Sequence, residues 1–134
     1  MFSPDALAKW NIGFFGMYSL QFLLVPSTLI DMNFVGAQKG AFVDFCCRFV
    51  GIWGVGYCIA TYCVKNKEQL MPANMFVNVM CLMCGPALAE FSPSTVGITG
   101  VTAMHHVGLV GCAGSVLAHG LAMTMPVKAK KSKK

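Results

Sequence analysis

Residues 10–30 read WNIGFFGMYSLQFLLVPSTLI and contain no charged side chain. A helix that crosses a bilayer needs about 20 consecutive, mainly apolar residues, so this stretch is long enough for one span. It lacks the basic start and the small-residue cleavage site of a signal peptide, and its apolar part is too long for one. We therefore predict a transmembrane helix over residues 10–30, with a kink or an early exit at Pro26, where proline removes a helix hydrogen bond.

Three further apolar stretches occupy residues 42–64, 72–89 and 100–123. Of the 134 residues, 56% are hydrophobic and 11% are charged, whereas roughly 25% are charged in ordinary soluble domains. A soluble protein of this size needs more charges than that to cover its surface. We predict an all-α fold, a polytopic membrane four-helix bundle over residues 1–126 with a polybasic tail at 127–134. This composition excludes a soluble enzyme, a disulfide-framed secreted module and a nucleic-acid binder.

The net charge of +5 is local, because five of the ten basic residues lie in the tail. These membrane-surface candidates are Lys128, Lys130, Lys131, Lys133 and Lys134. A polybasic segment beside a span is attracted to anionic lipid headgroups by about 1 kcal/mol per charge. With four spans, eight basic residues lie on the side that holds both termini and two lie on the other side. Both termini are therefore expected on the cytoplasmic-equivalent side.

Small residues in the second and fourth spans predict close helix packing. In membranes, glycine, alanine and serine at four-residue spacing let helix backbones approach each other. The glycine-rich fourth span is the surface that we expect to contact other membrane subunits. The candidate packing residues are Gly51, Gly54, Gly108, Gly111, Gly114 and Ser115.

All three histidines of the chain lie in the fourth span. His105 and His119 lie about 40° apart on one helix face and about 21 Å apart along its axis, while His106 points elsewhere. Asn78 shares a face of the third span with Asn74 and is a further candidate ligand. Polar residues in membranes either bind a ligand or form hydrogen bonds between helices, and both alternatives stay open here.

The histidine spacing resembles that of di-haem b cytochromes, but haem b needs a second axial ligand. The other spans contain no histidine, so that ligand would be a methionine such as Met80 or Met83, or would come from another subunit. Chlorophyll needs one axial ligand only, and we therefore rank chlorophyll above haem b. Bound lipids are the remaining expected ligands.

Catalytic motifs are missing from the sequence. We find no P-loop, H-E-x-x-H or G-x-S-x-G, and the five carboxylates lie near predicted helix ends. Cys81 and Cys84 form a C-x-x-C, but no second pair and no suitably spaced histidine completes a zinc site. We expect no enzyme activity and no bound metal.

The stretch GFFGMYSLQFLLVPSTLIDMNF, followed by CRFVGIWGVGYCIATY, resembles small four-helix membrane proteins of the DoxX-like kind. In that family a glycine-bearing first helix ends in a proline, and an arginine opens a glycine-rich second helix. Arg48, Gly51 and Trp53 also resemble the R-x-x-G-x-W region of the ergosterol-biosynthesis scaffold proteins of the endoplasmic reticulum, and Glu90 resembles an acid of their third helix. The histidine usually near that acid is absent, and Ser132 interrupts a dilysine retrieval signal. Neither resemblance implies a catalytic residue.

The expected function is that of a non-catalytic accessory or scaffold subunit of a larger integral membrane complex. A photosynthetic or respiratory supercomplex in the thylakoid or inner mitochondrial membrane would hold it if a histidine ligates chlorophyll or haem. One alternative is an endoplasmic-reticulum scaffold for lipid or sterol enzymes. The other is a small oligomeric channel or transporter. Its expected partners are other transmembrane subunits and membrane lipids with anionic headgroups, and no nucleic acid.

Overall fold

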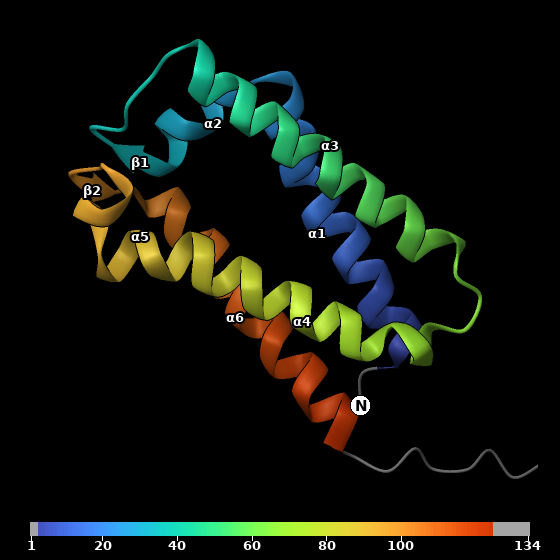
Figure 1. Ribbon diagram of the computed structural model, residues 1–134. Helices are drawn as coiled ribbons and strands as arrows, with labels where there is room; N and C mark the ends of the chain where they lie inside the picture. The colour runs from blue at the N-terminus through green and yellow to red at the C-terminus, as the bar shows by residue number, and fades with distance from the viewer. Residues whose placement is uncertain (1–2, 125–134) are drawn as a thin grey trace, which may run out of the picture.

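The computed structural model describes residues 3–124 and confirms an all-α fold, in which helices make up most of this part of the chain (Figure 1). The helices are α1 Pro4–Leu24, α2 Pro26–Asn33, α3 Ala41–Cys63, α4 Met71–Leu82, α5 Leu88–Phe91 and α6 Ala103–Thr124. Shorter elements join them, namely the 3-10 helices η1 Lys67–Leu70 and η3 Pro93–Val96, the π-helix η2 Met83–Ala87, and the strands β1 Phe34–Val35 and β2 Gly100–Val101. The tail predicted at 127–134, with its five lysines, lies outside the described residues.

Three helical segments of the described chain are long and apolar enough to cross a membrane. They are α3, α6 and the run Lys67–Phe91, which joins η1, α4, η2 and α5. The pair α1 and α2 meets the same criterion when both helices are taken together, which gives up to four spans. The lengths and compositions are those of a membrane protein.

The helix expected over residues 10–30 is divided at Val25, and the two parts, α1 and α2, are bent by 118°. Proline has no N–H to donate and disfavours helical backbone at the residue before it. Val25 accordingly leaves the helical region, with φ −136° and ψ 53°. The kink expected at Pro26 is therefore a sharp change of direction between α1 and α2.

Two charged residues near the start of α3 contact the bend between α1 and α2. Arg48 Nη1 donates a hydrogen bond to the carbonyl oxygen of Leu23, one of the last carbonyls of α1, at 2.5 Å. Asp44 accepts a hydrogen bond from Ser27 Oγ at 3.0 Å. The last carbonyls of a helix lack partners within the helix and favour a nearby cation. These contacts fix the bend against α3.

A short antiparallel ladder joins the segment after α2 to the segment before α6. Phe34 pairs with Val101, and Val35 pairs with Gly100. The Thr102 N–H donates to the Asn33 carbonyl oxygen at 3.0 Å beside this ladder. Because Gly100 and Val101 are in β2, the helix expected from residue 100 begins at Ala103.

The helices pack in two close pairs, α1 with α3 and α4 with α6 (Figure 1). A Cβ atom at Gly51 would lie 2.7 Å from the Ser19 carbonyl oxygen and 2.8 Å from the Leu23 amide nitrogen. At Gly54 it would meet the Ser19 side chain, and at Gly111 the Phe14 ring at 2.5 Å. Gly51, Gly54 and Gly111, which the sequence predicts as packing residues, therefore pack against α1 of the same chain.

The polarity of the interior is the reverse of that in a soluble protein. The largest fully buried side chains are His119, Asn11, Asn74, Asn78 and Thr61, all of them polar. Large apolar side chains lie outside, with Phe42 77% and Phe91 83% exposed. Contiguous apolar surface is unfavourable in water, whereas lipid accepts it. This distribution agrees with a protein surrounded by lipid.

The close approach of α1 and α3 predicts that Gly51→Ala destabilises the protein. The new methyl group meets backbone atoms of Ser19 and Leu23, and overpacking of this kind costs about 1–3 kcal/mol. Gly56→Ala, in the same helix, is the matched control because its Cβ would meet nothing within 4 Å. Thermal or denaturant unfolding in detergent measures both. Equal stability of the two variants would contradict the packing.

Candidate functional site

Asn11 of α1 is the centre of a polar network that joins the long helices. Its side chain is fully buried. Asn11 Nδ2 donates to the Tyr57 hydroxyl of α3 at 3.0 Å and lies 3.4 Å from His119 Nε2 of α6. Asn11 Oδ1 accepts from Asn78 Nδ2 of α4 at 3.3 Å and from Ser115 Oγ of α6 at 3.2 Å. One amide group therefore contacts three neighbouring helices.

The second part of this network lies on α4, where Asn74 and Asn78 are both buried. The Tyr57 hydroxyl donates to Asn74 Oδ1 at 2.9 Å, and Asn78 Nδ2 donates to the Asn74 carbonyl oxygen at 2.7 Å. Asn74 Nδ2 and Asn78 Oδ1 are buried without a hydrogen-bond partner among the described residues. Asn78, a predicted cofactor ligand, thus uses its amide nitrogen to hold helices together.

His119 is fully buried, and both of its ring nitrogens face protein atoms. Nδ1 lies 2.8 Å from the Ser115 carbonyl oxygen. A carbonyl only accepts hydrogen bonds, so Nδ1 carries the proton, and Nε2 of the neutral ring accepts from Asn11 Nδ2. An axial ligand of chlorophyll or haem needs a free nitrogen lone pair directed at the metal. A ligand role for His119 remains a prediction, and in the structure its ring joins α6 to α1.

His105 lies near the opposite end of α6 and is also buried. Its Nε2 is 3.1 Å from the Pro86 carbonyl oxygen, in the π-helix η2, and its ring is 5.4 Å from that of Phe34. Short π-helical segments are frequent at functional sites. His105 differs from His119 in that it lines the cavity described below.

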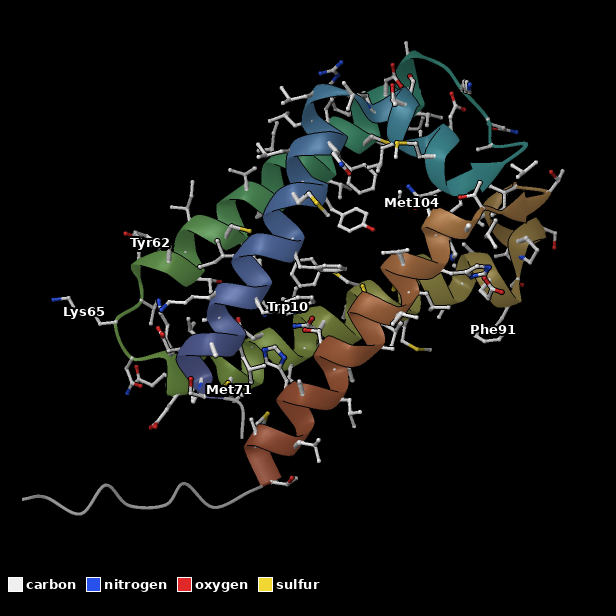
Figure 2. All side chains as sticks on the ribbon, turned by 180° about the vertical axis from the view of Figure 1, so that it is seen from behind. Trp10, Tyr62, Lys65, Met71, Phe91 and Met104 are labelled. Atoms are coloured by element: carbon white, nitrogen blue, oxygen red, sulfur yellow. The ribbon has the colours of Figure 1, made fainter. Side chains whose placement is uncertain are left out.

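His106 and Glu90 form a polar pair at the same end of the bundle. His106 Nδ1 lies 3.4 Å from Glu90 Oε2, and His105 Nε2 lies 3.8 Å from the same oxygen. The His106 side chain is 52% exposed and lies away from His119, as the sequence predicts. No group of three or more His, Cys, Asp or Glu side chains within residues 3–124 is arranged to hold a metal ion. In Figure 2, Phe91 and Met104 mark this end of the bundle, and Met71 marks the end that holds the polar network.

A cavity of about 680 Å³ lies between the two helix pairs. Volumes of about 300–1,000 Å³ are typical of sites for small organic ligands. Its lining includes His105, Gly108 and Cys112 of α6, whereas Ser115 and His119 lie one and two turns beyond it in the polar network. The aromatic rings that α1 and α3 contribute to its lining are Phe14, Phe15, Tyr18, Phe22, Trp53 and Tyr57.

The cavity is closed on the side where α1 meets α6. A Cβ atom at Gly108 would lie 3.1 Å from the Tyr18 hydroxyl, and the Phe14 ring lies against Gly111. On the opposite side, lining residues of α3 and α4 are strongly exposed, with Trp53 67% and Met80 43% exposed. The cavity therefore opens between α3 and α4, toward the surroundings of the bundle.

The residues predicted from the sequence lie in several places. Gly54, Gly108 and His105 line the cavity, and Ser115, His119 and Asn78 belong to the polar network. Gly114 faces outward, and a Cβ there would meet nothing within 4 Å. The three cavity-lining cysteines, Cys81, Cys84 and Cys112, are free thiols.

Sequence reasoning missed Asn11, Tyr57 and Tyr18. The argument applied to Asn74 and Asn78, that a polar side chain in a membrane span needs a partner, applies equally to Asn11 and to Tyr57. That signal was present in the sequence. The position of Tyr18 opposite Gly108 depends on how α1 and α6 pack, and the sequence carries no comparable signal for it.

No family model, curated protein or solved structure matches this chain.

The polar network predicts that Asn11→Leu destabilises the bundle by roughly 2–4 kcal/mol. The change removes contacts with Tyr57, Asn78, Ser115 and His119 and leaves buried polar groups without a partner. Gln21→Leu is the matched control, because it removes an amide from a partly exposed position of the same helix. Denaturant unfolding in detergent compares the two. A loss for Asn11→Leu no larger than that for Gln21→Leu would show that the network contributes little.

Proposed function

We propose that the protein is a non-catalytic accessory subunit of a larger integral membrane complex and that it contacts its neighbours through the outer face of α6. Asn11, Asn78 and His119, in the polar network of its interior, make hydrogen bonds that hold the helices together. This supports a structural role, because catalysis requires groups that can reach a substrate.

The outer face of α6 is the observation that carries this proposal. It consists of Val107, Val110, Gly114, Leu117 and Leu121, spaced alternately by three and four residues. This spacing forms a continuous seam along one side of a helix. Four of the five are large apolar residues on the exterior, and at Gly114 nothing occupies the space that a side chain would take. Helices in membranes associate through such small residues, which let the two backbones approach each other.

The outer face of α3 offers a useful contrast. It is also apolar, but its exposed side chains include the bulky Phe42, Phe45, Phe49 and Trp53. Bulky rings hold a neighbouring helix backbone at a distance, whereas glycine with valine and leucine allows close contact. We therefore place the subunit contact on α6 and leave α3 facing lipid.

The topology belongs to the same proposal. Both termini lie on the cytoplasmic-equivalent side, which is supported by the excess of basic residues there, eight against two. The first turn of α1 and the last turn of α6 lie at the same end of the bundle (Figure 1). A thylakoid or inner mitochondrial membrane is the favoured location, and the endoplasmic reticulum is the alternative.

We expect Gly114→Leu to release the protein from its complex, because the leucine side chain blocks close approach of a neighbouring helix. The measurement is blue-native electrophoresis after gentle solubilisation, in which the wild type migrates with a large assembly. Gly56→Leu, at an equally open glycine on the outer face of α3, is the control and is expected to stay in the assembly.

A photo-reactive amino acid at position 114 extends this test. We expect the residue at position 114 to cross-link to another polypeptide and the same residue at position 56 to cross-link to lipid. Migration of the wild type alone as a small homo-oligomer would overturn the accessory role and favour the channel or transporter.

The topology predicts that a lysine-specific protease reaches the C-terminal tail from the cytoplasmic-equivalent side only. Sealed organelles or inverted vesicles provide the two orientations for this measurement. A tag inserted in the loop that contains Lys39 is the internal control and should respond from the other side. Tail and loop accessible from one and the same side would contradict the three crossings expected between them, by α3, Lys67–Phe91 and α6.

A further inference from the structure

We propose that the cavity between the two helix pairs is a binding site for a neutral, lipid-soluble molecule whose apolar ring body carries a hydroxyl or carbonyl oxygen. Sterols and prenylquinones share this chemistry. The inference rests on the cavity and is independent of the packing proposed for α6.

The lining argues for an uncharged ligand. None of the described residues that line the cavity is Asp, Glu, Lys or Arg. A charged headgroup would enter a weakly polar space without a counter-ion, at high cost in free energy. Water is also poorly suited to the cavity, since a buried water molecule needs two to four polar partners. Phospholipid headgroups, fatty-acid carboxylates and ordered water are therefore disfavoured in this space.

The aromatic side chains argue for a ligand with flat, rigid rings. Phe14 and Tyr18 lie 5.2 Å apart between ring centroids, and Phe15 and Tyr57 lie 5.9 Å apart at an interplanar angle of 85°. Together with Trp53 these rings form walls on the α1 and α3 sides of the cavity. Aromatic rings favour stacked and edge-to-face contacts with other flat ring systems. A flexible acyl chain would gain less from such walls and would lose more conformational entropy.

The Tyr18 hydroxyl supplies the polar contact. It reaches from α1 to Gly108 of α6, one helical turn from His105. Among the tyrosine hydroxyls that line the cavity, that of Tyr57 already contacts Asn11 and Asn74. The hydrogen bonds within residues 3–124 include none for Tyr18, which leaves its hydroxyl able to donate to a carbonyl or accept from a hydroxyl. The ligand oxygen is therefore placed beside Tyr18.

The opening between α3 and α4 gives the route for the ligand. Val50 and Trp53 border it from α3, and Met80 borders it from α4. The three residues are apolar and lie within the two spans, so the opening faces the hydrocarbon region. A molecule dissolved in the bilayer enters sideways through this opening and does not cross water. The opposite side is closed by Phe14 and Tyr18 against α6.

The test uses the purified full-length protein in lipid nanodiscs and two probes, a photoactivatable cholesterol-type sterol and a short-chain photoactivatable ubiquinone. We expect saturable binding of one probe, with covalent labelling on residues 14–22 of α1 or 105–112 of α6. Tyr18→Phe should weaken that binding by about 3- to 10-fold, the effect of one lost hydrogen bond. Tyr62→Phe removes a hydroxyl from an exposed position on α3 and should leave the affinity unchanged. The probe that binds identifies the ligand class as sterol or quinone.

Val77→Trp is a second variant, which fills the cavity from α4 and should weaken binding by about 10-fold or more while helical circular dichroism stays constant. Binding of neither probe, equal affinity of the wild type and Tyr18→Phe, or labelling confined to Phe42, Phe45 and Phe49, which lie on α3 outside the cavity, would each overturn the proposal. Solvent extraction of the purified protein gives one further outcome. Chlorophyll or haem in the extract, seen by absorption and lost in His105→Ala, would overturn the sterol or quinone assignment and show that the ligand is a tetrapyrrole.

Discussion

A polar group inside a bilayer must find its hydrogen-bond partner within the protein, and this constraint explains the centre of the bundle. Asn11, Asn78 and His119 come from three different helices, and Asn11 contacts both of the others as well as Tyr57 and Ser115. Because lipid is as apolar as leucine, apolar side chains alone give the helices little reason to associate. The hydrogen bonds of the Asn11 amide favour association of the helices. Because hydrogen bonds are directional, they also favour one rotation of each helix about its own axis.

The bundle is held at two ends by different means, and the cavity lies between them. At the end that carries both chain termini of the described helices, the polar network joins α1, α3, α4 and α6. At the other end, the β1–β2 ladder ties α2 to the start of α6, while Arg48 and Asp44 fix the bend before α2. Between these ends α1 contacts α6 closely, but α3 and α4 diverge. The cavity thus lies between two sets of contacts that hold the helix pairs together at their ends.

The sequence predicts those features that depend on local composition. Segment length and hydropathy place the spans, and Pro26 indicates where the first helix changes direction. The start of α6 could not be predicted, because the partner of Gly100 and Val101 lies more than 60 residues earlier in the chain. Gly51 and Gly54 are recognisable as packing residues, but only the structure shows that their partner is Ser19 of the same chain. The histidine pattern is ambiguous for a similar reason. The spacing of His105 and His119 is the same whether the His119 ring nitrogen ligates a metal or accepts a hydrogen bond from Asn11.

A polar side chain whose donors and acceptors already have protein partners stabilises the bundle, whereas one without such partners can bind a ligand at lower cost. His119 has protein partners at both ring nitrogens, and replacing them with a ligand would cost the contacts that hold α6 to α1. Tyr18 is different, because its hydroxyl borders the cavity and has no such contact to lose. Binding at Tyr18 therefore adds a hydrogen bond without breaking one, whereas binding at His119 exchanges one for another. On this argument a ligand is bound at lower cost beside Tyr18 than at His119, whose contacts join α6 to α1.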